Sequence, residues 1–168
     1  MPMTLPPADA TDAAAEVQPR RHWLRVLARA RADDLARLAR PVLQDHRFEP
    51  LRAPEAGLVM VRARIGNTGD RFNLGEATVS RCVLRHQDSS GRATVGVGYV
   101  LGRDVERVGW MARLDALLQQ PHWRPRLMAD VVAPLAAALA YQRADAQRNT
   151  DRSRVQFYTL QSEGKGTP

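Results

Sequence analysis

Residues 65–118 read IGNTGDRFNLGEATVSRCVLRHQDSSGRATVGVGYVLGRDVERVGWMARLDALL and carry the strongest signals for the fold. A glycine-containing loop over 66–70 tolerates positive φ angles and precedes a predicted strand over 76–85. A second strand is predicted over 94–101, after a turn at Asp88–Gly91. Connections this short between neighbouring strands indicate an antiparallel meander.

A helix is predicted directly after this pair of strands. Gly102 breaks the second strand, and Asp104 is well placed as the N-cap of a helix that runs to about Gln120. On a helical wheel its apolar residues gather on one broad face: Val105, Val108, Met111, Ala112, Leu114 and Leu118. Asp115 falls within the same arc, which indicates either a satisfied polar group or an interface contact.

Two helices are predicted near the N-terminus. Residues 1–19 are rich in proline and alanine and are expected to form a disordered tail. Apolar residues at helical spacing follow, with Trp23 as the core anchor of the first helix. Asp33 and Asp34 are placed to cap a second short helix, which Pro41 disrupts or ends.

Two further strands are predicted between these helices and the meander. The first is short and covers Phe48–Ala53, and a turn follows at Pro54–Gly57. The second covers Leu58–Ile65, where alternation places Arg62 and Arg64 on the face opposite the apolar residues.

The C-terminal part is predicted to hold a helix over about Arg126–Arg148, kinked at Pro134, and a last strand over Val155–Leu160 that returns to the sheet. Residues 162–168 are expected to form a flexible tail. The fold class is therefore α+β, with a single domain over residues 20–161. It should contain an antiparallel sheet of four to five strands with two N-terminal and two C-terminal helices.

Length, composition and charge restrict the class of protein further. The single cysteine, Cys82, excludes an internal disulfide and reads as a small buried hydrophobe. No apolar run approaches the roughly 20 residues that cross a bilayer, so a cytoplasmic location is expected. The formal net charge of +7 favours acidic partners such as nucleic acid, nucleotides, phosphorylated small molecules or acidic protein surfaces. The arginines are scattered without interleaved aromatic residues, which is a weak signature of single-strand binding.

Metal and acid/base sites find little support in the residue pattern. The histidines are widely separated and none has an acidic or second histidine partner at helical spacing: His22, His46, His86 and His122. No metal site is therefore predicted. Asp104 and Asp115 lie about 16 Å apart along a helix, whereas paired glycosidase carboxylates lie roughly 5–9.5 Å apart.

Gly96 and Gly98, with Gly102, resemble a dinucleotide-binding fingerprint only in spacing. That fingerprint belongs in a turn between a strand and a helix, whereas Gly96 and Gly98 fall within a predicted strand. Strand glycines instead indicate the close approach of a bulky neighbour or of another chain.

The remaining candidate site is polar and lies at strand ends. It consists of Arg71, Asn73 and Glu76 together with Arg103 and Asp104. Two guanidinium groups, an amide and carboxylates of this kind can hold a phosphate or a ribose. They can equally hold a neighbouring subunit, and the sequence leaves both alternatives open.

The central part of the chain contains the segments TGDRFNLGEATVSRCVLR (68–85), GYVLGRD (98–104) and LDALLQ (114–119). They resemble the PhnG family, the G subunit of the bacterial carbon–phosphorus lyase system. The resemblance extends, in the same order, through RRHWLRVLARA (20–30), EAGLVMVRARIGNTG (55–69), VVAPLAAALA (131–140) and RVQFYTL (154–160). It covers most of the chain.

The resemblance implies a cytosolic enzyme complex with the H, I and J subunits of that system. Together with the I, H and L subunits, the family supports formation of α-D-ribose 1-methylphosphonate 5-triphosphate, in which methylphosphonate displaces adenine from the ribose of ATP. It further implies that the I subunit carries the chemistry and that this chain is accessory. ATP and methylphosphonate are then substrates of the complex, and the chain holds no cofactor of its own.

Two departures and one alternative accompany this resemblance. Val108 and Gly109 stand where relatives usually have an Ala-Glu pair, and Gln156 stands where an acidic residue is expected. Any role of those acidic residues is therefore in doubt here. The alternative, from another class, is a small basic nucleic-acid-binding protein with steeply salt-dependent affinity.

Overall fold

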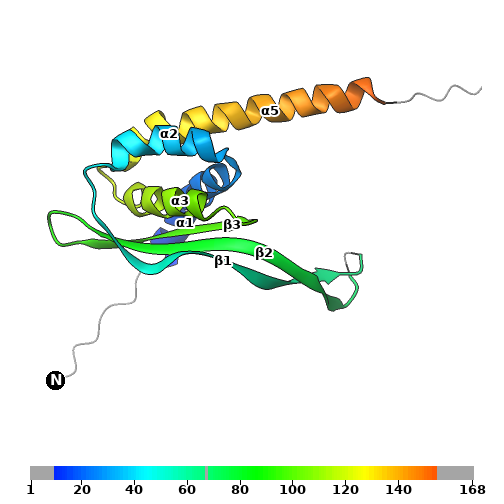
Figure 1. The fold of residues 1–168 in the computed structure, drawn as a ribbon, viewed down its shortest axis with the longest axis horizontal. Coiled ribbons are helices and arrows are strands. Elements are labelled where there is room, and N and C mark those ends of the chain that lie inside the picture. The colour runs from blue at the N-terminus through cyan, green and yellow to red at the C-terminus, as the bar shows by residue number, and fades with distance from the viewer. Residues whose placement is uncertain (1–9, 67, 155–168) are drawn as a thin grey trace, which may run out of the picture.

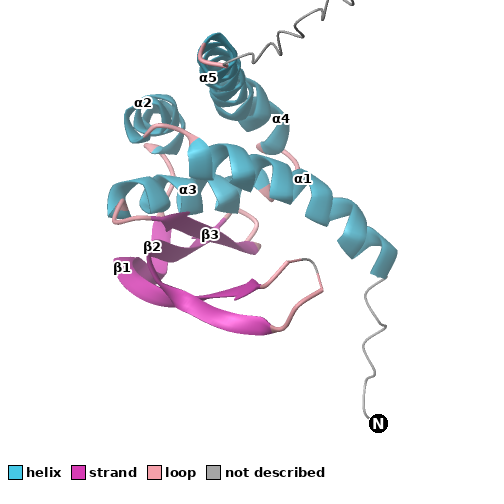
Figure 2. Cartoon of the chain, turned by 90° about the vertical axis from the view of Figure 1, so that its right-hand side faces the viewer, coloured by secondary structure: helices cyan, strands magenta, loops and turns pink. Residues whose placement is uncertain are grey.

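A computed structural model describes residues 10–66 and 68–154. Its elements are, in order, α1 (Ala10–Arg29), α2 (Ala32–Leu43), β1 (Phe48–Arg64), β2 (Arg71–Gln87), β3 (Ala93–Leu101), α3 (Val105–Leu118), α4 (Arg124–Leu127), the π-helical segment η1 (Met128–Val132) and α5 (Ala133–Arg152). The strands form one antiparallel sheet in the order β1-β2-β3. Helices α1 and α3 lie against one face of the sheet, and α2, α4 and α5 lie over them (Figure 2). The predicted α+β class and antiparallel pairing are confirmed.

The predicted number of strands is wrong for the described residues, which contain three. Phe48–Ala53 and Leu58–Ile65, predicted as separate strands, belong to the single strand β1, which ends at Arg64. The expected turn at Pro54–Gly57 is instead an irregular stretch of this strand, with register shifts against β2. Proline is tolerated here because β1 is an edge strand. The strand predicted over Val155–Leu160 lies outside the described residues.

The N-terminal helices differ in detail from the prediction. Helix α1 begins at Ala10, within the segment 1–19 that was expected to be disordered. In α2 the N-cap is Arg31, whose side chain makes no capping hydrogen bond, so Asp33 and Asp34 lie in the first turn rather than at the cap. Acidic residues in the first turn still interact favourably with the positive N-terminal end of the helix dipole.

The final helical segment is interrupted where a kink was predicted. The π-helical segment η1 directly precedes α5, and Pro134 lies in the first turn of α5. Proline has no N–H to donate to the carbonyl four residues earlier, which accounts for the irregular turn. Helix α5 packs on η1 and α1 rather than on the sheet, and its far half extends away from the domain (Figure 1).

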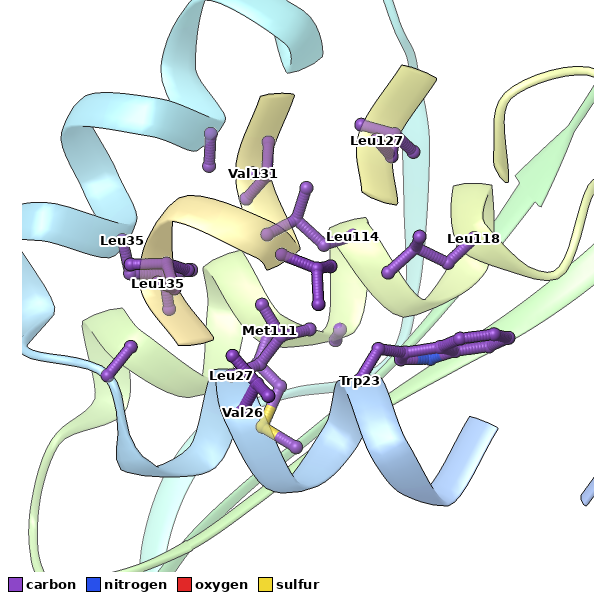
Figure 3. Packing of buried hydrophobic residues seen from close by; sticks show 14 of the residues in the cluster. Trp23, Val26, Leu27, Leu35, Met111, Leu114, Leu118, Leu127, Val131 and Leu135 are labelled. Carbon is purple, nitrogen blue, oxygen red and sulfur yellow. The ribbon is translucent and has the colours of Figure 1, made fainter. Parts of the chain in front are cut away.

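The core lies between the sheet and the two layers of helices. Figure 3 shows its side chains meeting from α1, α2, α3 and the C-terminal helices, with Trp23 almost fully buried as predicted. Cys82 is also fully buried, and burial raises the pKa of its thiol. In the described ranges, no helix combines the length and apolar character needed to cross a membrane.

Strand β3 and helix α3 make an unusually close contact through glycine. A Cβ atom added to Gly96 would lie 1.9 Å from the Ala112 carbonyl oxygen, and one added to Gly98 would lie 2.2 Å from that of Val108. The prediction that these glycines admit a bulky neighbour is confirmed. The neighbour is the backbone of α3.

Asp115 connects α3 to the free edge of β3. Its fully buried carboxylate accepts hydrogen bonds from the Trp23 Nε1–H group (2.9 Å) and the Val97 backbone N–H group (2.9 Å). The Arg20 guanidinium donates two further bonds, at 2.8 and 3.2 Å. The side-chain amide nitrogen of Gln119 donates a hydrogen bond to the Val95 carbonyl oxygen on the same strand edge (2.8 Å). The prediction of a satisfied polar group at Asp115 is thus confirmed.

Candidate functional site

The β1–β2 hairpin extends well beyond the third strand of the sheet (Figure 1). Strand β3 pairs with β2 only over residues 79–87. Beyond that point β1 and β2 pair with each other alone. We call this part, residues 58–64 of β1 and 71–78 of β2 with their connection, the distal hairpin.

The distal hairpin brings together three of the predicted site residues. In the β1–β2 register Arg64 lies opposite Arg71, Arg62 lies opposite Asn73, and Met60 lies opposite Glu76. Residues directly opposite each other in an antiparallel ladder share a face, as do alternate residues of one strand. Arg71, Asn73 and Glu76 therefore share one exposed face of the hairpin with Arg62 and Arg64.

The three arginines surround a shallow pocket of about 380 Å³, which is lined by Arg62, Ala63, Arg64 and Arg71. Among the residues that the structure describes, none of the three forms an ion pair with an acidic group. The pocket is therefore strongly electropositive and suits an anion, either a phosphate or a carboxylate.

The other two predicted residues lie where β3 ends and α3 begins. The Gly102 backbone N–H group donates to the Thr78 carbonyl oxygen (2.9 Å), so Arg103 follows a residue that is bonded to the base of the distal hairpin. Arg103 is exposed. Asp104 has a structural role, because its carboxylate caps α3 at the Arg107 N–H group (2.9 Å) and also pairs with the Arg107 guanidinium (3.2 Å).

A second polar site was missed at the level of sequence. His46, His86 and His122 line one pocket of about 410 Å³ together with Trp123 and Asp88. The Nδ1 atom of His46 lies 3.2 Å from Nε2 of His86. In the described parts of the chain, no group of three or more histidine, cysteine or acidic residues is arranged to hold a metal ion.

The hydrogen bonds around His86 fit a neutral imidazole. The Thr94 hydroxyl donates to the Ala116 carbonyl oxygen (3.0 Å), so it accepts from the Gln120 amide nitrogen (2.9 Å). The same nitrogen lies 2.8 Å from Nδ1 of His86, which therefore accepts. With this orientation of the Gln120 amide, the Nε2–H group of His86 donates to Nδ1 of His46, an arrangement in which both imidazoles are neutral.

A family model and a known relative each match most of the amino-acid sequence. The family model described as phosphonate metabolism protein PhnG matches residues 18–162. A protein of Rhizobium meliloti (strain 1021), named alpha-D-ribose 1-methylphosphonate 5-triphosphate synthase subunit PhnG, is 42% identical over 147 residues, covering 87% of this chain and 90% of that protein. The chain belongs to the PhnG family. The resemblance inferred from its sequence segments is confirmed.

In this PhnG-family chain the histidine pair makes stability depend on pH. Burial lowers the pKa of His46, and burial together with the neighbouring His46 lowers the pKa of His86; Asp45 and Asp88 oppose these shifts, and His122 adds to them. Below a pH of about 6.5 the unfolded chain binds protons that the folded chain does not. Stability from this pair is thus complete above about pH 6.5 and is lost as the pH falls.

We expect the melting temperature of the chain to fall between pH 7.5 and pH 5, and His46→Gln to make that fall shallower. Differential scanning fluorimetry across this pH range measures the effect. His22→Gln, at an exposed position on α1, is the matched control and should leave the slope unchanged. Equal slopes for all three proteins would contradict the assignment.

Proposed function

We propose that this chain is the G subunit of a complex that makes α-D-ribose 1-methylphosphonate 5-triphosphate in the cytoplasm. The observation that carries the proposal is the 42% identity to a protein named as a subunit of that synthase, over 90% of its length. The partners are the H, I and J subunits of the carbon–phosphorus lyase core complex, with the L subunit in the synthase reaction. Methylphosphonate and ATP are the substrates of the complex, and adenine is displaced.

The chain acts as an accessory rather than a catalytic subunit. Catalytic sites are usually concave and exclude water. The polar residues of the distal hairpin, together with Arg103, are instead exposed on an open surface. This arrangement supports a role in holding another molecule, and a partner subunit then supplies the reacting groups.

Charge pairing argues against the alternative of a nucleic-acid-binding protein. Many arginines form ion pairs with acidic residues of the same chain: Arg20, Arg37, Arg52, Arg81, Arg85, Arg107, Arg126 and Arg148. Phosphate binding by an extended basic face needs cations that are free to release counterions. Eight of the chain's 24 arginines are thus engaged by its own carboxylates in the described residues and are not free for phosphates.

The test is co-expression of this chain with the H, I and J subunits, followed by size-exclusion chromatography with mass detection. We expect one large stoichiometric assembly. With the L subunit, methylphosphonate and ATP added, that assembly should release adenine, and omission of this chain should reduce the release at least about tenfold, a loss of roughly 1.4 kcal/mol or more in transition-state stabilisation.

A chain that stays monomeric beside these subunits would overturn the proposal. Salt-dependent binding of DNA or RNA by the isolated chain at physiological salt would then favour the nucleic-acid alternative. Adenine release by the chain alone would contradict the accessory role while leaving membership of the family intact.

A further inference from the structure

The face of the sheet that the helices cover continues onto the distal hairpin without a cover. Ser80 is fully buried beneath the helices, and Thr78 and Glu76 follow it on the same face of β2. Their partners on β1 are Leu58 and Met60. These two apolar side chains expose 62% and 53% of their surface, and Figure 1 shows the β1–β2 hairpin extending past the end of α3.

Further apolar side chains are exposed around the end of the hairpin. Ile65, Phe72 and Leu74 each expose between 40% and 72% of their surface. Strand β1 is also an edge strand, so its outer backbone groups face no other strand of the described sheet. Exposed apolar side chains gathered beside a free strand edge mark an interaction surface.

Arginines on the near half of the same ladder all have acidic partners. Arg81 donates to the Glu55 carboxylate across the strands at 2.7 Å, and Arg85 pairs with Glu49 in the same manner. Cross-strand pairs of opposite charge of this kind stabilise a sheet. The near half of the hairpin thus neutralises its own arginines.

The distal half of the hairpin instead places arginines next to one another. Arg64 lies directly opposite Arg71, a pairing of like charges that destabilises an antiparallel ladder, and Arg62 lies two residues along on the same face. An arrangement that is unfavourable in the isolated chain becomes favourable when carboxylates of another molecule lie between the guanidinium groups.

We infer that the distal hairpin docks onto another subunit of the complex, whose contact surface combines apolar side chains with aspartate or glutamate carboxylates. The inference rests on the proposed function and names the surface that serves it. It assigns Arg62, Arg64 and Arg71 to the carboxylates and Leu58 and Met60 to the apolar part. Arginine and methionine are both enriched at protein interfaces.

Two other occupants fit the surface less well. A second copy of this chain would place the same arginines against one another across a two-fold axis. A free oligophosphate would neutralise the arginines but would leave Leu58 and Met60 exposed to water. A partner polypeptide satisfies both parts of the surface.

Arg71→Glu is the decisive variant, because it separates docking from folding. In the isolated chain it replaces the Arg64–Arg71 repulsion by a cross-strand ion pair, so the melting temperature should stay the same or rise. In the complex it places a carboxylate against the carboxylates of the partner. The affinity for a preformed assembly of the other subunits should then fall by at least about tenfold.

Affinity is measured by biolayer interferometry of the full chain against the co-expressed H, I and J subunits. Arg143→Glu is the matched control, since Arg143 is an exposed arginine on α5 outside this surface, and it should bind like the wild type. Leu58→Ser combined with Met60→Ser should weaken binding as well, without lowering the melting temperature.

Each other outcome overturns the inference. Wild-type affinity of Arg71→Glu refutes docking through the hairpin and leaves the proposed function standing if the wild-type chain assembles. Equal weakening of the affinity by Arg71→Glu and Arg143→Glu would show that binding depends on the overall charge of the chain and not on the hairpin. Normal assembly of Arg71→Glu with a raised KM for ATP assigns the arginines to the triphosphate. If the wild-type chain itself fails to bind, the proposed function falls too.

Discussion

Gly98→Ala is expected to destabilise the folded chain by about 3 kcal/mol or more. The new Cβ atom would lie 2.2 Å from the Val108 carbonyl oxygen and 3.0 Å from its Cα atom. These are backbone atoms in the first turns of α3, so no side-chain rotation relieves the overlap. The helix must move away from the sheet, and the core between them loses its packing.

Thermal unfolding of the purified chain measures this loss. For a domain of this length, 3 kcal/mol corresponds to a fall of roughly 6–12 °C in melting temperature. Gly57→Ala is the control, because the atom nearest to its added Cβ is the end of the Arg81 side chain at 4.0 Å. Equal melting temperatures of the Gly98→Ala and Gly57→Ala proteins would show that α3 is not held as tightly against β3 as the structure indicates.

The close contact of α3 and β3 shows how far the sequence predicts the fold. Glycines in an alternating strand indicate that something approaches closely, and the helix that begins after Asp104 is predicted by its cap and apolar face. That the approaching element is this same helix does not follow from either pattern. It depends on the short connection at Gly102, which turns α3 directly back onto β3.

The error in β1 has a different cause. Proline and glycine at residues 54–57 are turn signals in isolation, and most turns are predicted from such residues. Here the chain lies at the edge of the sheet, where a missing N–H group and irregular register are tolerated. Edge position is a property of the assembled sheet, so local signals cannot reveal it.

The distal hairpin and the histidine site also differ in how far local sequence patterns predict them. Arg71 and Asn73 share a face through the alternation of one strand, so local reasoning can group them, whereas Glu76 joins that face only through the register shift of β2 between Asn73 and Gly75. His46 and His86 come from the α2–β1 connection and the end of β2, and they meet because the antiparallel register of β1 and β2 places Phe48, two residues after His46, opposite His86. The two histidines lie at neither helical nor CxxC-like spacing, so the sequence does not indicate that they form a pair.

Asp115→Ala is expected to destabilise the chain by about 4 kcal/mol, a fall of roughly 8–16 °C in melting temperature. Asp115 is fully buried, and its removal leaves the Trp23 Nε1–H group and the Val97 N–H group without their acceptor. Each unsatisfied buried donor costs about 1–3 kcal/mol. The guanidinium of Arg20 is partly exposed and regains water, which limits the loss from the broken ion pair.

The same change should also open the free edge of β3, because Val97 lies on that edge and loses the side chain that covers it. We therefore expect light scattering to rise together with unfolding, since uncovered strand edges promote aggregation. Asp130→Ala is the control, because Asp130 forms an exposed ion pair with Arg126 that is worth at most about 0.5 kcal/mol. Similar melting temperatures for the two variants would mean that packing around Trp23, and not the buried carboxylate, holds α1 and β3 to α3.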